Sequence, residues 1–284
     1  MKKLRNCVSA QLNTGGSACG IDWGKVKGAI LVEHGQKLPA SLTAQTLAQS
    51  CHADRPARIY PIVGFVEYAK EGGEAQVSAI GYGPNQYNGM AAQTDVFTLP
   101  RFDEMLNSQL ISCANKDWDV YYVDSNRALI GYNDGTDVLA GIPMAAVYPV
   151  ATQYSTSGAA SSMTVNFCQA DAEDAQKHFD YVVLDFNPMQ VIKGLTECSL
   201  VETSHASKKY KIVENIGGYD RTAEFGNVFA AAVSSVMTGA ASATYESGTI
   251  NITGEGPLVV KQPSDLFKAE IKWIDITAIV EAAE

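Results

Sequence analysis

Residues 119–132, DVYYVDSNRALIGY, contain the clearest pair of strands in the sequence. Two apolar runs rich in β-branched and aromatic residues flank a polar stretch at 124–127, DSNR. Runs of this composition favour strands, and a short polar stretch between them predicts a hairpin. A third strand is expected at 142–150, so this part of the chain is predicted to form an antiparallel meander.

Further elements are expected on the N-terminal side of this meander. Residues 58–68, RIYPIVGFVEY, predict a buried strand that breaks or bulges near Pro61 and Gly64. Earlier in the chain, Ser41 is expected to cap a short helix that reaches residue 51. A strand at 76–82 is expected to lead into GYGPNQYNG, whose glycines, proline and asparagines predict a long irregular loop.

Helices and strands alternate through the rest of the chain. Apolar residues spaced three and four apart predict amphipathic helices at 101–113 and 225–236. The run FDYVVLDF at 179–186 predicts a strand buried on both faces, after a short acidic-first helix at 172–178. The polar stretch 153–162 is expected to be a loop. Further strands are expected at 163–167, 191–201, 209–214, 242–253 (a hairpin turning at Ser247 and Gly248) and 268–280, the last with a bulge near Trp273.

The composition bounds the class of protein. The chain has 284 residues, of which 46% are hydrophobic and 18% charged, and its formal net charge is −10. A length of this order can bury a core without disulfides or metals. The negative charge disfavours binding to a phosphate backbone, which requires a clustered basic face. The low charge content is typical of a protein whose polar surface is covered by partners, or of a β-rich surface built from uncharged polar residues.

The N-terminus and the cysteines indicate the compartment. MKKLRNCVSAQLNTGG begins like an export signal but lacks the continuous apolar stretch of roughly 7 to 15 residues. No window approaches the ~20 apolar residues that cross a bilayer. We therefore expect a chain without a membrane anchor that stays in the cytoplasm. The six cysteines are too widely spaced for a CxxC motif and are expected to be free thiols: Cys7, Cys19, Cys51, Cys113, Cys168 and Cys198.

One internal similarity relates the two halves of the chain. Residues 62–67, IVGFVE, and 192–197, IKGLTE, share their isoleucine, glycine and glutamate. Each motif leads through a second strand and a glycine-rich loop to a predicted helix and then to a predicted hairpin. Repetition of this order predicts a β-rich α+β fold with two related antiparallel β-sandwich or barrel units, each with one flanking helix.

This arrangement resembles the tail-tube family of tailed bacteriophages and related contractile devices, which includes members with two fused tube units. The features that carry the resemblance are the two I-x-G-x-x-E strands, the GYGPNQYNG loop, and the helices that begin at Phe102 and Phe225 with the hairpins after them. The resemblance runs from about residue 58 to the end. The predicted organisation is an N-terminal arm with a short helix (1–57), a first tube-like unit (58–152), a connecting loop, strand and short helix (153–190) and a second tube-like unit (191–284).

The resemblance implies a ring-forming virion structural protein. Its partners would be other copies of itself, within and between stacked rings, and other virion proteins, with DNA passing non-specifically through the channel. The chain would assemble in the cytoplasm of the host bacterium. A negative channel wall suits a sliding duplex, and strand edges that pair with neighbouring subunits would be closed by assembly.

No motif in the sequence predicts catalysis, and no catalytic, cofactor-binding or metal-binding residue is assigned. Cys51, His52 and Asp54 lie close together, but adjacent helical residues point in different directions and do not form a nucleophile–base pair. The NDGTD stretch at 133–137 lacks the bidentate acid of a calcium loop, so a polar turn is predicted. The four histidines are too far apart for a helical metal motif: His34, His52, His178 and His205.

Two other readings of the sequence stay open. An arm and pseudo-repeated β units would also suit a capsid-associated protein, either a shell or a decoration subunit. A carbohydrate-binding or hydrolytic β-protein would expose Trp23, Trp118 or Trp273 for stacking on sugars, with neighbouring acids acting in pairs.

Overall fold

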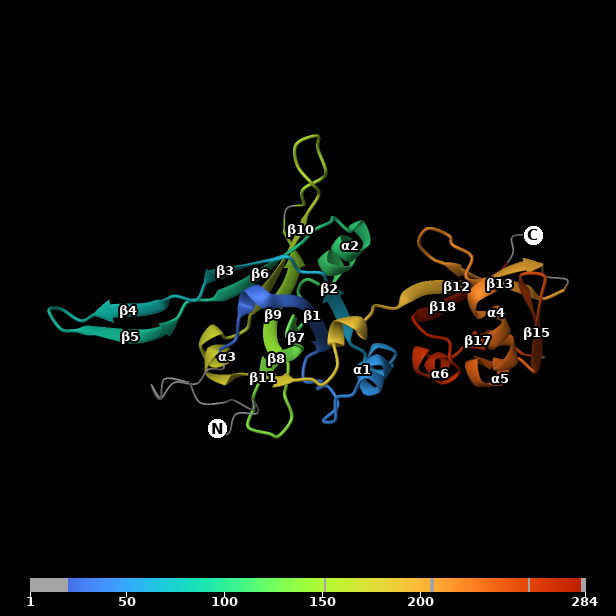
Figure 1. The fold of residues 1–284 in the computed structure, drawn as a ribbon, viewed down its shortest axis with the longest axis horizontal. Coiled ribbons are helices and arrows are strands. Elements are labelled where there is room, and N and C mark those ends of the chain that lie inside the picture. The colour runs from blue at the N-terminus through green and yellow to red at the C-terminus, as the bar shows by residue number, and fades with distance from the viewer. Residues whose placement is uncertain (1–19, 151, 205–206, 255, 282–284) are drawn as a thin grey trace. The chain divides into compact units, whose positions relative to one another are not determined.

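The computed structural model (Figure 1) shows a chain that divides into two compact units. The division runs through the first helix. The structure describes residues 20–150, 152–204, 207–254 and 256–281. Unit 1 comprises Met1–Leu47 and Ile59–Ile192, and unit 2 comprises Ala48–Arg58 and Lys193–Glu284.

In its described residues, unit 1 is built on strands with three helices and two short 3₁₀ turns. Its helices are α1 (Ala44–Cys51, which ends in unit 2), α2 (Glu104–Ser112) and α3 (Ala172–His178), and its 3₁₀ turns are Trp23–Lys25 and Pro188–Gln190. Its strands are β1 (Val26–Glu33), β2 (Tyr60–Val63), β3 (Glu67–Gly72), β4 (Ala75–Ala79), β5 (Asn85–Met90), β6 (Gln93–Leu99), β7 (Trp118–Asp124), β8 (Ala128–Tyr132), β9 (Ile142–Pro149), β10 (Met163–Gln169) and β11 (Phe179–Val183).

The main sheet of unit 1 branches at β7. Among the described residues it has nine strands, with the path β11-β8-β7-β9-β10-β6-β3 and with β1 joining β7 to β2. Strand β7 pairs with β1 along one edge and with β8 and β9 along the other, and all of its residues are buried. A strand enclosed in this way favours a continuous run of apolar and aromatic residues, which VYYV at 120–123 supplies. The core around it contains Phe97, Tyr122 and Phe167.

Unit 2 has a smaller sheet with helices packed against it. Its sheet order is β15-β16-β13-β12-β18, in which β12 and β18 are parallel and the other pairs antiparallel. Phe229 and Leu266 lie in its core. The elements are β12 (Thr196–Ser204), β13 (Lys209–Glu214), α4 (Thr222–Ala231), α5 (Val233–Val236), β14 (Met237–Thr238), β15 (Ser242–Glu246), β16 (Thr249–Thr253), β17 (Val259–Val260), α6 (Pro263–Lys268) and β18 (Ile274–Val280).

The β-rich α+β class and many local predictions are confirmed. The hairpin predicted at 119–132 is β7–β8, and Asp124 accepts hydrogen bonds from the backbone of Asn126 and Ala128 at its turn. The strand predicted at 58–68 breaks at Gly64, whose φ of +97° separates β2 from β3. The hairpin at 242–253 turns at Ser247 and Gly248, both of which have positive φ.

The predicted boundaries of the first unit are wrong. Strand β1 pairs with β2 and β7, so 26–33 belongs to the sheet and not to an arm. Strands β10 and β11 also belong to this sheet, so 163–183 is not a connector. The apolar sequence of these strands explains both corrections, because it must be buried against the same core. The rest of the predicted arm, residues 1–19, lies outside the described residues.

The two units do not repeat one strand arrangement. In unit 2 the hairpin after the helix returns to the strand before it, since β16 pairs with β13. In unit 1 the hairpin after α2 pairs with β1, β9 and β11, and not with β6. The shared glycines also differ, because Gly64 has a φ of +97° whereas Gly194 is outside the left-handed region. The match between 62–67 and 192–197 therefore does not reflect equivalent backbone structure.

Three smaller predictions are corrected as well. The run at 179–186 was expected to be buried on both faces, but β11 is the last strand of its sheet and Val183 is 59% exposed. The cap of α1 is formed by Thr43, which exchanges backbone and hydroxyl hydrogen bonds with Thr46. The final strand begins at Ile274, and its bulge lies opposite the step from Cys198 to Ser199.

Candidate assembly surface

The most exposed element of unit 1 is the hairpin formed by β4 and β5. Figure 1 shows it extending beyond the sheet, in continuation of β3 and β6. Its strands pair from Ala75 opposite Met90 to Ala79 opposite Asn85, with one irregularity. A hydrogen bond of 2.6 Å from Asn88 to Ser78 crosses between them. We call residues 75–90 the projecting hairpin.

Two glycines determine how the projecting hairpin leaves the sheet. Gly72 and Gly73 have φ values of +71° and +74°, which L-residues with side chains rarely adopt. A Cβ on Gly72 would lie 2.1 Å from the carbonyl oxygen of Ala92. The backbone ladder resumes at once, because the amide of Gly73 donates to that same oxygen at 3.0 Å. The EGGE sequence at 71–74 thus forms the joint between sheet and hairpin.

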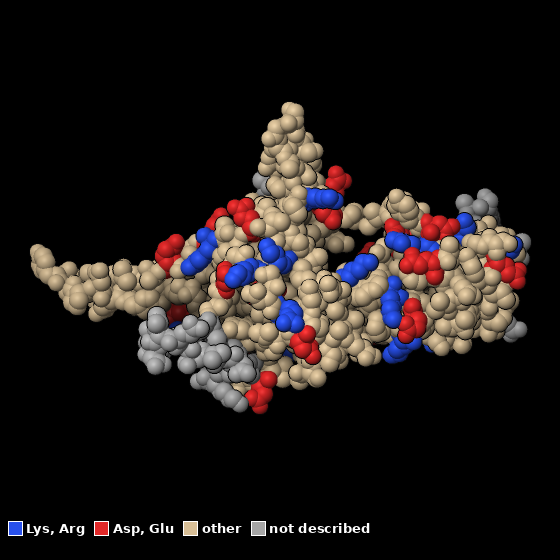
Figure 2. Space-filling model, viewed as in Figure 1, with Lys and Arg blue, Asp and Glu red and all other residues tan. Residues whose placement is uncertain are grey.

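The surface of the projecting hairpin is uncharged and partly apolar. Residues 75–90 contain no Asp, Glu, Lys, Arg or His. In Figure 2 this element is free of the red and blue that mark charge. Val77, Ile80, Tyr82 and Tyr87 are all more than half exposed, and Ile80 reaches 75%. Such a surface is depleted in the charges that keep a solvated projection apart from other chains.

Helix α3 supports the base of the projecting hairpin. The helix begins after Asp171, whose carboxylate accepts the amide of Asp174 at 2.9 Å. Partial desolvation and a hydrogen bond to Glu173 raise the pKa of Tyr87. Lys177 donates to the same glutamate at 2.6 Å. The charge of Glu173 beside Tyr87 is therefore balanced by the cation of Lys177.

A second uncharged projection joins β9 to β10. Residues 152–162 belong to a longer stretch, 138–170, that has no charged residue. This loop is held by bridges between Gln153 and Ser162 and between Thr156 and Ala159. Figure 2 shows it as a second tan projection from unit 1. It confirms the loop predicted at 153–162.

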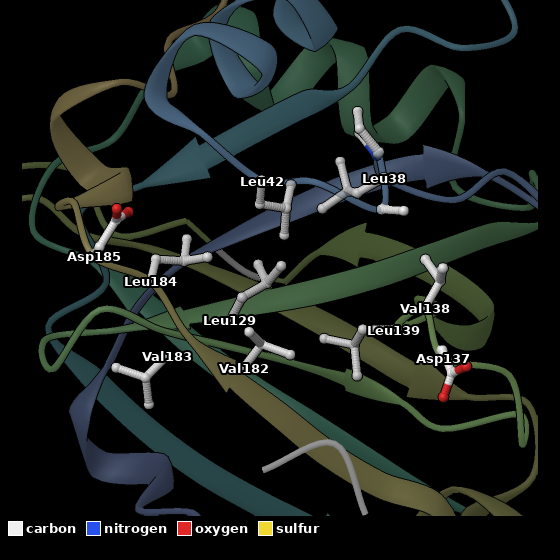
Figure 3. Close-up of a pocket in the computed structure, with 12 residues that line it drawn as sticks. Leu38, Leu42, Leu129, Asp137, Val138, Leu139, Val182, Val183, Leu184 and Asp185 are labelled. Atoms are coloured by element: carbon white, nitrogen blue, oxygen red, sulfur yellow. The ribbon is translucent and has the colours of Figure 1, made fainter. Parts of the chain in front are cut away.

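Unit 1 also has a shallow apolar cavity of about 290 Å³. Apolar residues form most of its lining, and they come from the 38–42 segment, β8, residues 138–139 and residues 182–184. Figure 3 shows the carboxylates of Asp137 and Asp185 at opposite ends of it. Acids that do not converge cannot act as a catalytic pair on one bond.

Cys51, His52 and Asp54 do not converge on one point. Burial raises the pKa of the Cys51 thiol to about 11, which keeps it protonated and unreactive. Both ring nitrogens of His52 are engaged, one with Ala48 and one with Trp273. Asp54 accepts a hydrogen bond from the hydroxyl of Ser264 at 2.9 Å.

The other polar candidates have local structural partners. Asp134 is paired with Lys37, and this contact, with bonds from Thr136, lowers its pKa to about 2. The NDGTD stretch is confirmed as a polar turn, in which Asn133 accepts the amide of Gly135 at 3.0 Å. The described residues contain no group of three or more His, Cys, Asp or Glu side chains arranged to hold a metal ion.

The remaining histidines and the tryptophans are placed as follows. His34 bonds Asp119 at 2.8 Å and His178 lies beside Asp174, while His205 is outside the described residues. Trp23 packs against Tyr68, Tyr122 and Phe179, Trp118 is 5% exposed, and Trp273 lies against His52. Trp118 is thus buried, and Trp23 and Trp273 are half-buried against other aromatic rings.

The structure adds several elements that sequence reasoning missed, among them β1, β6, α6 and, in the projecting hairpin, β5. Residues 85–90 were expected to be irregular, but they form β5. Polar and glycine residues such as those in NQYNG favour a loop. Here pairing with β4 stabilises a strand in spite of that preference. The sequence feature that could have marked 75–90 as a distinct surface element is its absence of charged residues.

Comparison of the sequence with models of known protein families found no match, and comparison with curated proteins found none either. Over the residues that the structure describes, no helix combines the length and the apolar character needed to cross a bilayer.

Proposed function

We propose that this chain is a non-enzymatic virion structural protein, a subunit of a phage tail tube that self-assembles into stacked rings around a DNA channel. The observation that supports it most is the pair of uncharged projections of unit 1, at 75–90 and 152–162. A projection that exposes valine, isoleucine and tyrosine without charge costs solubility unless another surface covers it. A second copy of the chain is the simplest partner that would bury these projections.

The open sheet edges support the same proposal. In the described residues, the branched main sheet of unit 1 ends at β11, β3 and β2, and that of unit 2 ends at β15 and β18. Edge strands have backbone groups available for pairing with another chain. Pairing around a closed ring satisfies each edge with its neighbour's edge. The net charge of −10 suits a channel through which DNA must slide.

We assign the tube role to unit 1 alone. Both projections and the branched sheet belong to it, and unit 2 has a different strand order. This assignment replaces the expectation of two fused and equivalent tube units. Unit 2 is then an additional domain carried by each subunit.

The test is electron microscopy of the purified full-length chain beside a trimmed variant. The variant replaces 75–90 with an Asn-Gly turn between Glu74 and Ala91, whose backbones already share a hydrogen bond of 2.9 Å. The proposal is supported if the full chain forms rings or tubes and the variant forms neither, or forms single rings in place of tubes. Monomers of the full chain at high concentration and several salt conditions contradict it, and closed shells favour a capsid role.

A further inference from the structure

His52 lies at the centre of a small set of contacts within unit 2. Its side chain is fully buried. Nδ1 lies 2.8 Å from the carbonyl oxygen of Ala48, and the backbone amide of Trp273 donates to Nε2 at 2.8 Å. The ring also packs against Phe267 and Trp273, with centroid distances of 4.4 and 4.6 Å.

These two hydrogen bonds determine the protonation state of the ring. A carbonyl oxygen only accepts, so Nδ1 must carry a hydrogen. A backbone amide only donates, so Nε2 must present its lone pair. His52 is therefore neutral in this arrangement. A second proton would set an N–H against the N–H of Trp273 and leave that part-buried amide without its acceptor.

His52 is one of several contacts between residues 48–58 and the rest of unit 2. Arg58 donates to Asp275 at 2.8 Å, and Asp54 accepts from Ser264 at 2.9 Å. On the other side, the turn before β18 contains Glu270 and Trp273 with φ values of +64° and +67°. A turn in this sparsely populated conformation must be maintained by its contacts.

We propose that His52 is a pH-sensitive clasp: its protonation breaks the bond to Trp273 and releases segment 48–58 from the turn that precedes β18. The proposal concerns unit 2 by itself and does not depend on the tail-tube assignment. Both partners of the ring belong to the backbone. A hydroxyl or a side-chain carboxamide could rotate to present an acceptor to a protonated histidine, but a backbone amide cannot.

The charges around the clasp favour this response. Burial is the main cause that lowers the pKa of His52, and the cations Arg58 and Lys272 lower it further. The four carboxylates on the surrounding elements already have partners. Asp54 is bound to Ser264, Asp275 to Arg58, Asp265 to Lys268, and Glu270 to Lys272. The titratable and charged groups on the elements packed around the ring are Cys51, Asp54, Arg55, Arg58, Lys193, Asp265, Lys268, Glu270, Lys272 and Asp275.

The sign of the pH effect follows from linkage. Because the pKa of His52 is lower in the folded than in the unfolded state, its contribution to stability is fully present above the unfolded value of about 6.5. It is lost as the pH falls through the folded value. Acidification therefore opens the clasp and does not tighten it.

Hydrogen exchange with mass spectrometry on the full-length chain tests the clasp. Peptides covering 48–58 and 269–276 are compared at pH 7.5 and 5.0 after correction for the intrinsic exchange rates. We expect their opening constant to rise by up to roughly tenfold per pH unit as the pH falls from about 6.5 toward the folded pKa of His52, and to level off below that pKa. Peptides of β7 in unit 1 should not change. Opening of β7 together with 48–58 would indicate general unfolding and overturn the proposal.

Two variants complete the test. His52→Gln cannot titrate and should abolish the pH response of both unit 2 peptides, whereas His34→Gln in unit 1 should leave it intact. An unchanged response in His52→Gln overturns the proposal. If that variant does not fold, exchange at the imidazole Cε1 of the wild-type chain reports the titration of His52 itself. A midpoint at or above 6.5 overturns the proposal, because a protonated ring would then fit the clasp.

Discussion

Gln169 donates its side-chain amide to the carboxylate of Asp95 at 2.7 Å, between neighbouring strands β10 and β6 in the interior of unit 1. Asp95 is fully buried and also accepts from Gln93, Tyr68 and Tyr122. Four donors from different strands thus converge on one carboxylate. This buried polar group specifies the register of the surrounding strands as well as contributing to their stability.

Replacing Asp95 should destabilise unit 1. Asp95→Leu leaves four donors, three of them on buried residues, without this acceptor, and we expect a loss of about 3 kcal/mol in the free energy of unfolding. Urea denaturation of the variant and the wild type measures it. Asp137→Leu, at an exposed position, is the control and should change stability by less than about 0.5 kcal/mol.

The same carboxylate should make stability depend on pH. Burial raises the pKa of Asp95, although the four hydrogen bonds act in the opposite direction. Because the folded value lies above the unfolded one, the contribution of Asp95 is present below the unfolded pKa and lost as the pH rises through the folded pKa. Asp95→Asn should remove this part of the profile. Identical pH dependence of unfolding in variant and wild type would refute the assignment.

Gly72 should not tolerate a side chain. With a φ of +71° and a Cβ position 2.1 Å from the oxygen of Ala92, Gly72→Ala must shift the joint of the projecting hairpin. We expect a loss of about 2 kcal/mol by chemical denaturation. Gly158→Ala is the matched control, since nothing lies within 4 Å of its Cβ and its φ is not positive. Equal stabilities of the two variants would contradict the proposed strain.

A single charge on the projecting hairpin should impair assembly. Ile80→Lys places an ammonium group on a surface that the proposed interface would desolvate, so fewer or shorter tubes are expected by light scattering and microscopy. Ile111→Lys is matched in residue type and is also exposed, at 61% against 75% for Ile80, but it lies on α2. Equal effects of the two substitutions would exclude a specific role of the hairpin.

The ion pair of Arg58 and Asp275 should be strongly coupled. The two side chains are 11% and 15% exposed and 2.8 Å apart, and Arg58 also donates to the carbonyl of Ala53. Arg58→Met leaves a largely buried carboxylate without its cation, and we expect a loss of about 3 kcal/mol. A double-mutant cycle with Asp275→Asn measures the coupling. Additive losses would show that the pair contributes nothing as a pair.

Local sequence patterns specified many elements of this protein. The apolar runs around 124–127 determine the β7–β8 hairpin, and the acids at 103 and 104 mark the start of α2, where Asp103 accepts the amides of Met105 and Leu106. Turn residues and helix caps act over a few positions, so neighbouring residues contain the necessary information. The absence of charge from 75–90 and 138–170 is also a property of the sequence by itself.

Tertiary structure decided which elements belong together. Whether 179–186 is enclosed or at an edge depends on how many strands pair with it, and only β8 does. The four donors to Asp95 come from 68, 93, 122 and 169, and the partner of His52 is Trp273. Pairing over such separations depends on the closure of long loops around a shared core, which no local pattern encodes. Local sequence therefore determined many of the strands and the composition of the surface, and the packed fold determined the remaining strands and the neighbours of each.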